Sequence, residues 1–406
     1  MYNRWAMAFQ NPTEEFVYNL CRSSFLSLWS YANPRREGSA KELCDVLVVC
    51  EPHVLIFSVK YSELKDADDR VAVDRWIRKT VNASVEEIYG AERNLARATH
   101  VTRSDGQQGL PLPPLAEKRV HRISISLGGQ RSIPLTLKDW GKGFVHCFDE
   151  HFVQIALQEL DTIADFIAYL EAKENLSRSK QQRVIIMGGE EDLLAVYLHQ
   201  GRKFPQTDII MIDENLWATF SQNPAYRRRL AADEVSYVWD NLIEYISEFA
   251  LTNRMEFGGT LANNEVALRF MARESRLARR MLSETFLEFR ERAKRGEASA
   301  RMTPSISGVT YVFFNPPVSY ERRVRFMELE CRCFIARNEI PENKTVIGIG
   351  LNVEPAPQGF AVDLVFLSYP EWPPDHRAQA EEMKQELGFF RNTQFQSDQV
   401  DEYPEE

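Results

Sequence analysis

Long apolar runs are missing from this sequence of 406 residues. The longest, residues 46–50 and 54–59, are separated by Glu51, Pro52 and His53, and both are far shorter than the roughly 20 residues that cross a bilayer. The first ten residues also lack the apolar core of a signal peptide. These absences predict a protein without a membrane partner and with a cytoplasmic location.

Paired cysteines and the common catalytic signatures are also missing. The six cysteines include no Cys-x-x-Cys pair, which predicts free, reduced thiols of structural type. His146, Cys147 and His151 lie close in sequence but lack a second Cys/His pair, so we expect no structural zinc site there. The chain contains neither a GxxxxGK[ST] phosphate loop nor a GxSxG nucleophile turn. These absences exclude a P-loop motor and a typical serine hydrolase.

An excess of positive charge is missing as well. The chain has 49 Lys and Arg against 59 Asp and Glu, a formal net charge of −10. A surface with this balance repels polyphosphate on average. Any contact with nucleic acid is therefore expected to come from a local basic patch, a partner protein or a homo-oligomer.

Apolar periodicity predicts an α/β protein in three parts. Residues 1–130 show the pattern of an α-β-β-α-β core, with a Gly- and Pro-rich loop at residues 104–114. Residues 131–300 show mostly helical periodicity. Residues 301–406 predict a small α/β module that ends in a frayed acidic tail at residues 396–406.

The individual elements follow from the same patterns. The predicted helices span residues 14–30, 69–98, 152–173, 190–199, 231–251, 264–295 and 319–337. The predicted strands span residues 46–49, 54–60, 120–127, 184–187, 208–212, 309–314, 345–352 and 361–367.

The first predicted helix carries an acid on its apolar side. Its apolar stripe contains Val17, Leu20, Cys21, Ser24, Phe25 and Leu28, and Thr13 is a candidate N-cap after Pro12. Glu14 falls about 40° from the centre of this stripe and Glu15 about 140° away. An inward carboxylate costs free energy unless a cation pairs with it, which points to a metal. Alternatively, Glu14 only complements the helix dipole.

The strands at 46–49 and 54–60 predict a hairpin with polar residues at one end. Asp45 begins the first strand, and Ser58 and Lys60 share one face at the end of the second. In an antiparallel hairpin the start of one strand lies beside the end of the other, so Asp45 and Lys60 are expected to be neighbours. Carboxylates that hold Mg²⁺ beside a lysine that orients water are suited to phosphodiester hydrolysis.

These residues resemble the motif of the PD-(D/E)XK nuclease superfamily, over about residues 12–128. The resemblance assigns Glu14 as the helix acid, Asp45 as the motif aspartate and Lys60 as the motif lysine. Residues 33–60 are also similar to poorly characterised bacterial nuclease-related proteins. The resemblance implies a restriction-endonuclease-like core, Mg²⁺ or Mn²⁺ as cofactor, cleavage of DNA or RNA, and a place in a bacterial antiviral defence or repair assembly.

The chain departs from this motif at Ser58, where the family has an acid two residues before the lysine. Glu87 lies about 60° from the centre of the sheet-facing stripe of the second helix and is expected to supply the missing oxygen. Glu42 is a second candidate. The expected catalytic set is Asp45, Lys60, Glu14 and Ser58, with Asp45, Glu14 and Glu87 as metal ligands. The alternative is a degenerate nuclease fold that acts as a non-catalytic scaffold for nucleic acid or protein.

Two arginine clusters are weaker candidates for nucleic-acid contact. The predicted helix 264–295 repeats arginine every three or four residues, and Arg273, Arg276 and Arg280 could form a phosphate-facing stripe. Interleaved acids such as Glu274 favour a solvated surface instead. The second cluster, Arg322, Arg323 and Arg325, opens a helix, where positive charge is unfavourable, and this suggests an external anion or acidic partner.

Overall fold

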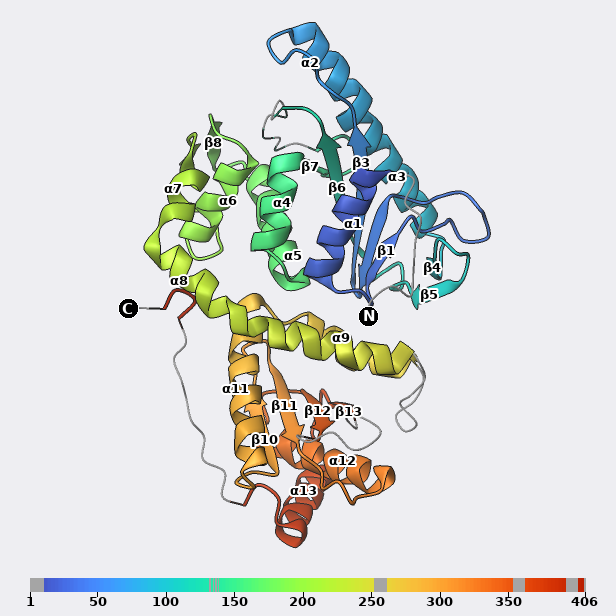
Figure 1. Cartoon of the computed structure of the whole chain (residues 1–406), viewed down its shortest axis with the longest axis vertical. Helices are drawn as coiled ribbons and strands as arrows, with labels where there is room; N and C mark the ends of the chain where they lie inside the picture. The colour runs from blue at the N-terminus through green and yellow to red at the C-terminus, as the bar shows by residue number, and fades with distance from the viewer. Residues whose placement is uncertain are drawn as a thin grey trace. The chain divides into compact units, whose positions relative to one another are not determined.

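The computed structural model of the protein describes residues 11–130, 133, 135, 137, 139–251, 261–352, 362–391 and 401–404. The chain is mixed α/β, as predicted, and forms two compact units, residues 1–226 and 227–406 (Figure 1). The predicted middle part, residues 131–300, is divided between these units. Apart from residues 401–404, the predicted frayed tail lies outside the described residues.

A five-stranded mixed sheet organises the first unit, in the order β1-β2-β3-β6-β7. Its strands are β1 (Ser30–Ala32), β2 (Val46–Cys50), β3 (His53–Tyr61), β6 (Arg119–Leu127) and β7 (His146–Asp149). The first three strands are antiparallel neighbours, whereas β3, β6 and β7 run parallel. Two small two-stranded sheets accompany it, formed by β4 (His100–Thr102) with β5 (Gln108–Pro111) and by β8 (Arg183–Ile186) with β9 (Ile209–Ile212). The predicted loop at residues 104–114 therefore contains a short strand.

Helices cover both faces of the five-stranded sheet. The helices of the first unit are α1 (Pro12–Phe25), α2 (Arg70–Ile77), α3 (Ala83–Leu95), α4 (Glu150–Glu159), α5 (Ile163–Arg178), α6 (Glu190–His199) and α7 (Leu216–Gln222), and α8 (Pro224–Asp233) follows. On one face, Val85 and Ile88 of α3 share a core with Leu47 and Ile56. On the other, the Phe57 ring lies against Phe25 of α1 and Phe166 of α5. This alternation follows from the period of two along each strand.

The second unit contains a four-stranded sheet in the order β10-β11-β12-β13. Its strands are β10 (Ala300–Pro304), β11 (Val309–Phe314), β12 (Thr345–Leu351) and β13 (Val362–Ser368). Its helices are α9 (Tyr237–Leu251), α10 (Leu261–Ala272), α11 (Arg276–Lys294), α12 (Arg322–Glu339) and α13 (Pro374–Leu387). Helix α12 buries Leu329, Cys333 and Ala336 against the sheet. The predicted strands of this region are present, and β10 and α13 are elements that were not predicted.

Several helix boundaries differ from the prediction because polar caps interrupt the apolar periodicity. Helix α1 is capped by Asn11, whose Oδ1 accepts the Thr13 N–H at 3.0 Å, so Thr13 is not the N-cap. Pro12 occupies the first helical position, where a missing N–H costs nothing. Thr162 caps α5 and Ser275 caps α11. The helices predicted at 152–173 and 264–295 are therefore each split in two.

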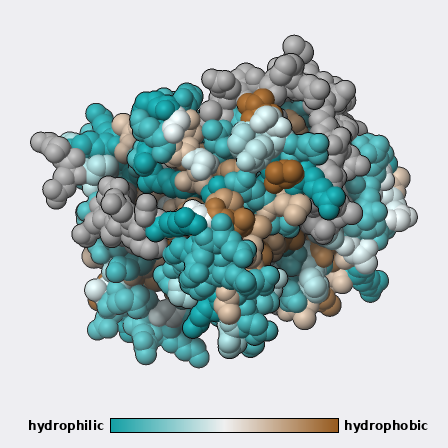
Figure 2. All heavy atoms as spheres, turned by 90° about the horizontal axis from the view of Figure 1, so that it is seen from below, coloured by the Kyte–Doolittle hydropathy of each residue, from teal (hydrophilic) through white to brown (hydrophobic). Residues whose placement is uncertain are grey.

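Most large apolar side chains lie in the cores, and five exposed ones lie together at β8 and β9, namely Ile185, Ile186, Met187, Ile209 and Met211. The face shown in Figure 2 is mostly hydrophilic, with hydrophobic residues in small separate groups. No helix within the described part of the chain is both long and apolar enough to cross a membrane. All six cysteines are free, as predicted, and five of them are buried.

Candidate functional site

Asp45 lies where the hairpin prediction put it, immediately before β2 and beside the end of β3. The register pairs Val46 with Phe57, so Asp45 lies opposite Ser58. Its carboxylate Oδ2 accepts the backbone N–H of Val59 at 2.5 Å. The side chain is buried, with 7% of the residue exposed. Lys60 lies two residues beyond Ser58 on the same face of β3, and Asp45 and Lys60 influence each other's pKa, which agrees with the prediction that they are neighbours.

Glu87 of α3 reaches the position that an acid at residue 58 would occupy. Its Oε2 lies 2.6 Å from the Lys60 amine and accepts the Ser58 hydroxyl at 3.1 Å. Ser84, one helical turn earlier, donates to the backbone carbonyl of Ser58 at 3.1 Å and holds α3 against the strand. Because Val85 and Ile88 pack into the core, Glu87 is directed to the rim of the sheet.

Glu14 and Glu42 complete the same cluster. Glu14, in the first turn of α1, is partly buried, whereas Glu15 is exposed. This agrees with the predicted inward direction of Glu14. Its charge raises the pKa of both Asp45 and Glu42, and a hydrogen bond links the carboxyl groups of the latter two. The structure thus brings Glu14, Glu42, Asp45, Lys60 and Glu87 to one end of the sheet. We call these five residues the carboxylate–lysine cluster.

Burial and like charge perturb the protonation of this cluster. Burial raises the pKa of Asp45 to about 7, and the charges of Glu14 and Glu42 add to it, against the Val59 hydrogen bond and Lys60. Partial burial, followed by the charge of Glu14, raises the pKa of Glu42. Burial would lower the pKa of Lys60, but its hydrogen bond to Glu87 and the surrounding carboxylates outweigh it and raise that pKa.

The donor atoms fit a hard divalent cation. Four carboxyl groups face a single ammonium group, and all the available ligands are oxygens, which Mg²⁺ and Mn²⁺ prefer. Glu14 and Glu42 place like charge beside the buried carboxylate of Asp45. A cation among these carboxylates would compensate this charge. The residues present therefore fit a metal of this class.

Ser126 is a site residue that sequence reasoning missed. It pairs with Lys60 across β3 and β6, and Ser124 pairs with Ser58. Both β6 hydroxyls are buried and have no hydrogen-bond partner within the described residues. Their alternation with Ile123 and Ile125 already marks a polar face on an otherwise apolar strand. Two free hydroxyls therefore face the same side of the sheet as the Lys60 amine.

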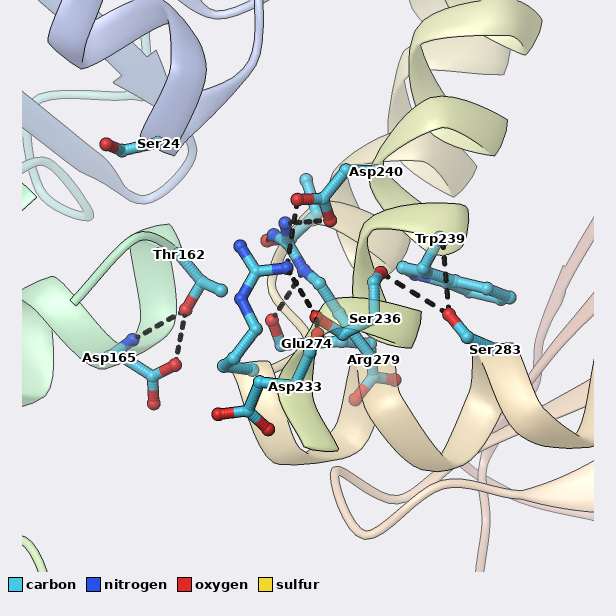
Figure 3. Close-up of polar contacts among 12 residues, drawn as sticks. Ser24, Thr162, Asp165, Asp233, Ser236, Trp239, Asp240, Glu274, Arg279 and Ser283 are labelled. Carbon is cyan, nitrogen blue, oxygen red and sulfur yellow. Dashed lines mark hydrogen bonds and ion pairs between the residues drawn. The ribbon is translucent and has the colours of Figure 1, made fainter. Parts of the chain in front are cut away.

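Most of the predicted arginine stripe is buried and not exposed to solvent. Arg276 and Arg280 are 3% and 2% exposed and pair with Asp240 and Asp233 at 3.0 and 3.1 Å. Arg279 donates to Asp240 and to the carbonyls of Ala272 and Glu274 (Figure 3). These guanidinium groups neutralise buried acids, so Arg276 and Arg280 cannot meet phosphate from outside. Only Arg273 of the three predicted contacts is exposed.

The interleaved acid Glu274 is not solvated either. It is fully buried, and its carboxylate accepts hydroxyls from Ser305, Ser307 and Tyr311 at 2.6–2.8 Å. This set of hydrogen bonds ties the segment between α10 and α11 to the sheet of the second unit.

The arginines at the start of α12 have an acidic partner within the chain. The Arg325 Nε lies 3.0 Å from Asp363 Oδ2, and Arg322 lies 3.9 Å from the other carboxylate oxygen. Asp363 belongs to β13 and is buried. The external anion suggested by this cluster is therefore not required, because a distant strand supplies the negative charge.

Comparisons of the chain with protein-family models, with curated proteins and with solved structures found no match.

Proposed function

We propose that the chain is a metal-dependent nuclease whose active site is the carboxylate–lysine cluster. The observation that carries this proposal is the convergence of Glu14, Asp45, Lys60 and Glu87 from one helix, a hairpin and a second helix. The order of elements supports it, since a helix acid, a strand-start aspartate and a strand-end lysine follow the PD-(D/E)XK pattern. In this proposal Glu87 takes the place of the acid that Ser58 replaces.

Each side chain has a definite role in this proposal. Asp45, Glu14 and Glu87 would hold Mg²⁺ or Mn²⁺, which supplies Lewis-acid stabilisation of the charge that grows on the phosphoryl oxygens. The Lys60 amine would donate a hydrogen bond to the attacking water or to a phosphoryl oxygen. Ser58 fixes the Glu87 carboxylate beside that amine through its 3.1 Å hydrogen bond.

Substrate binding in this proposal relies on more than the chain's own charge. The net charge is −10, and two of the three arginines predicted to contact phosphate, Arg276 and Arg280, are used in buried ion pairs. A basic partner protein or a second copy would therefore help to hold DNA or RNA against the cluster. We expect cleavage by the isolated chain to be weak and to fall steeply with salt.

The test is metal-dependent cleavage of plasmid DNA and single-stranded RNA by the purified chain. With Mg²⁺ or Mn²⁺, wild-type protein is expected to cleave one of the two, and Asp45→Ala and Lys60→Ala to lose at least about 100-fold in rate. Glu15→Ala, which changes the exposed acid beside Glu14, is the matched control and should keep full activity. Equal cleavage by Asp45→Ala and wild-type protein would refute the assignment.

The second candidate is a scaffold that keeps the nuclease fold without catalysis. The observation that favours it is Ser58, because Glu87 is shared between the Ser58 hydroxyl and the Lys60 amine and is less available to a metal. The scaffold is the better description if two results are found together. Neither nucleic acid is cleaved, and calorimetry detects either no Mn²⁺ binding or the same Mn²⁺ binding by wild type and Asp45→Ala.

A further inference from the structure

Three histidines form a diagonal row across the first sheet, which starts at the end away from the carboxylate–lysine cluster and reaches the level of Phe57. They lie on adjacent strands: His53 begins β3, His121 lies in β6 and His146 begins β7. The register pairs Leu55 with His121 and Ile123 with His146. Each histidine therefore lies two residues further along the strand direction than the histidine on the neighbouring strand before it. With a period of two, all three side chains fall on the same face as Phe57, under α5.

Helix α5 adds carboxylates to this row. One ligand atom from each of His53, His121 and Glu171 lies within 4.8 Å of the others. The His53 Nδ1 and His121 Nε2 atoms are 3.0 Å apart. One turn further along α5, Glu174 lies 3.3 Å from the Nε2 atom of His146. The helix therefore presents Glu171 and Glu174 to the row three residues apart, as neighbours on one helical face.

We infer that His53, His121 and Glu171 form a binding site for a divalent transition-metal ion of the Zn²⁺ class. Two imidazoles and one carboxylate are a recurrent zinc ligand set that leaves a fourth position open. Imidazole nitrogens favour Zn²⁺ over Mg²⁺, so this site differs in chemistry from the oxygen-only cluster. His53 and Lys60 are seven residues apart along β3, which corresponds to about 23 Å.

The distances suit such an ion. Tetrahedral coordination with Zn–N bonds of about 2.0–2.1 Å brings ligand nitrogens to about 3.3 Å from each other. The two imidazole nitrogens, at 3.0 Å, are already close to that value. The Glu171 carboxylate has to approach by no more than about 1.5 Å, which a side-chain torsion can provide.

The state of the histidines also favours a metal over a purely structural role. His53 and His121 are 9% and 4% exposed. The Nδ1 atoms of His121 and His146 are buried without a hydrogen-bond partner within the described residues. Packing alone does not explain the rings of His121 and His146 here, because burying polar groups without full hydrogen bonding costs free energy.

The test is Zn²⁺ binding by the full chain, measured as metal content after dialysis and by titration calorimetry. Wild-type protein is expected to retain one Zn²⁺ per chain. Glu171→Gln should weaken binding at least tenfold, and the double change His53→Ala with His121→Ala should abolish it. His199→Ala, which removes an exposed histidine of α6, is the matched control and should bind as wild type does.

Two further measurements separate this inference from the proposed nuclease activity and from misfolding. Asp45→Ala should keep its Zn²⁺, whereas its Mn²⁺ binding is lost. Glu171→Gln should keep the wild-type circular dichroism spectrum, because it changes only one atom of an exposed residue. The inference is overturned if wild-type protein retains no Zn²⁺, or if the histidine and Glu171 variants bind it as tightly as wild type does.

Discussion

Replacing Asp45 with asparagine should stabilise the protein at neutral pH while removing its affinity for metal. Asp45 is buried among other carboxylates, and its pKa is raised from 3.8 to about 7. Folding therefore favours the protonated form, so ionising Asp45 above its unfolded-state pKa costs stability. Asparagine has nearly the same shape, can still accept the Val59 N–H and carries no charge. The substitution removes the cost of ionisation without removing the hydrogen bond.

The magnitude follows from the pKa difference. At about 1.4 kcal/mol per pKa unit, the rise from 3.8 to about 7 corresponds to about 4 kcal/mol. The stability that protonated Asp45 contributes is fully present below pH 4 and is lost as the pH rises through 7. Asp45→Asn should therefore match wild type near pH 4 and exceed it by about 2–4 kcal/mol at pH 8. The lower value allows for the mutual influence of the neighbouring carboxyl groups.

The assay is urea unfolding of both proteins at pH 4.5 and pH 8 in the presence of a chelator. Mn²⁺ added at pH 8 should then raise the unfolding midpoint of wild type but not of Asp45→Asn. Glu15→Gln provides the control for removing an exposed acid and should show no pH-dependent difference. The reasoning is refuted if Asp45→Asn is less stable than wild type at pH 8, or if the difference between them does not change with pH.

Three other outcomes test separate parts of the structure. Glu87→Ala should lower the cleavage rate at least about 100-fold. Adding Ser58→Glu to this variant should restore part of the rate, because it returns an acid to the strand. If the double variant cleaves no faster than Glu87→Ala, the role of Glu87 is contradicted. Arg279→Ala should lower the free energy of unfolding by about 3–5 kcal/mol, because it leaves Asp240 buried with one ion-pair partner fewer. The control Arg273→Ala should change it by less than about 0.5 kcal/mol. If denaturant melts give the two variants similar free energies of unfolding, the burial of Arg279 is contradicted. Thr162→Ala should cost about 1 kcal/mol through loss of the α5 cap, measured in the same melts, whereas Thr162→Ser should cost less.

The hairpin shows how much local sequence can predict. Two apolar runs joined by a short turn fix an antiparallel pair, and the period of two fixes which residues share a face. These rules place Asp45 beside the end of β3, because both lie within one hairpin. The inward side of α1 follows in the same way from the helical period, which directs Glu14 inward and Glu15 outward.

The arginines show where the same reasoning fails. Their helical spacing is equally consistent with a solvated stripe and with a buried one, since periodicity reports which side chains share a face and not what covers that face. The decision depends on Asp233 and Asp240, which lie about 40 residues earlier in the chain. Arg322 and Arg325 likewise depend on Asp363 of β13.

The sequence by itself determined the α/β character, most strands, the bounds of α6 and the meeting of Asp45 with the end of β3, because these features depend on short-range periodicity and chain connection. The tertiary structure decided that Glu87 lies beside Ser58 and Lys60, because this requires α3 to dock on the sheet. It also decided that three histidines from separate strands lie in one row, because strand order and register are set by contacts between residues distant in sequence.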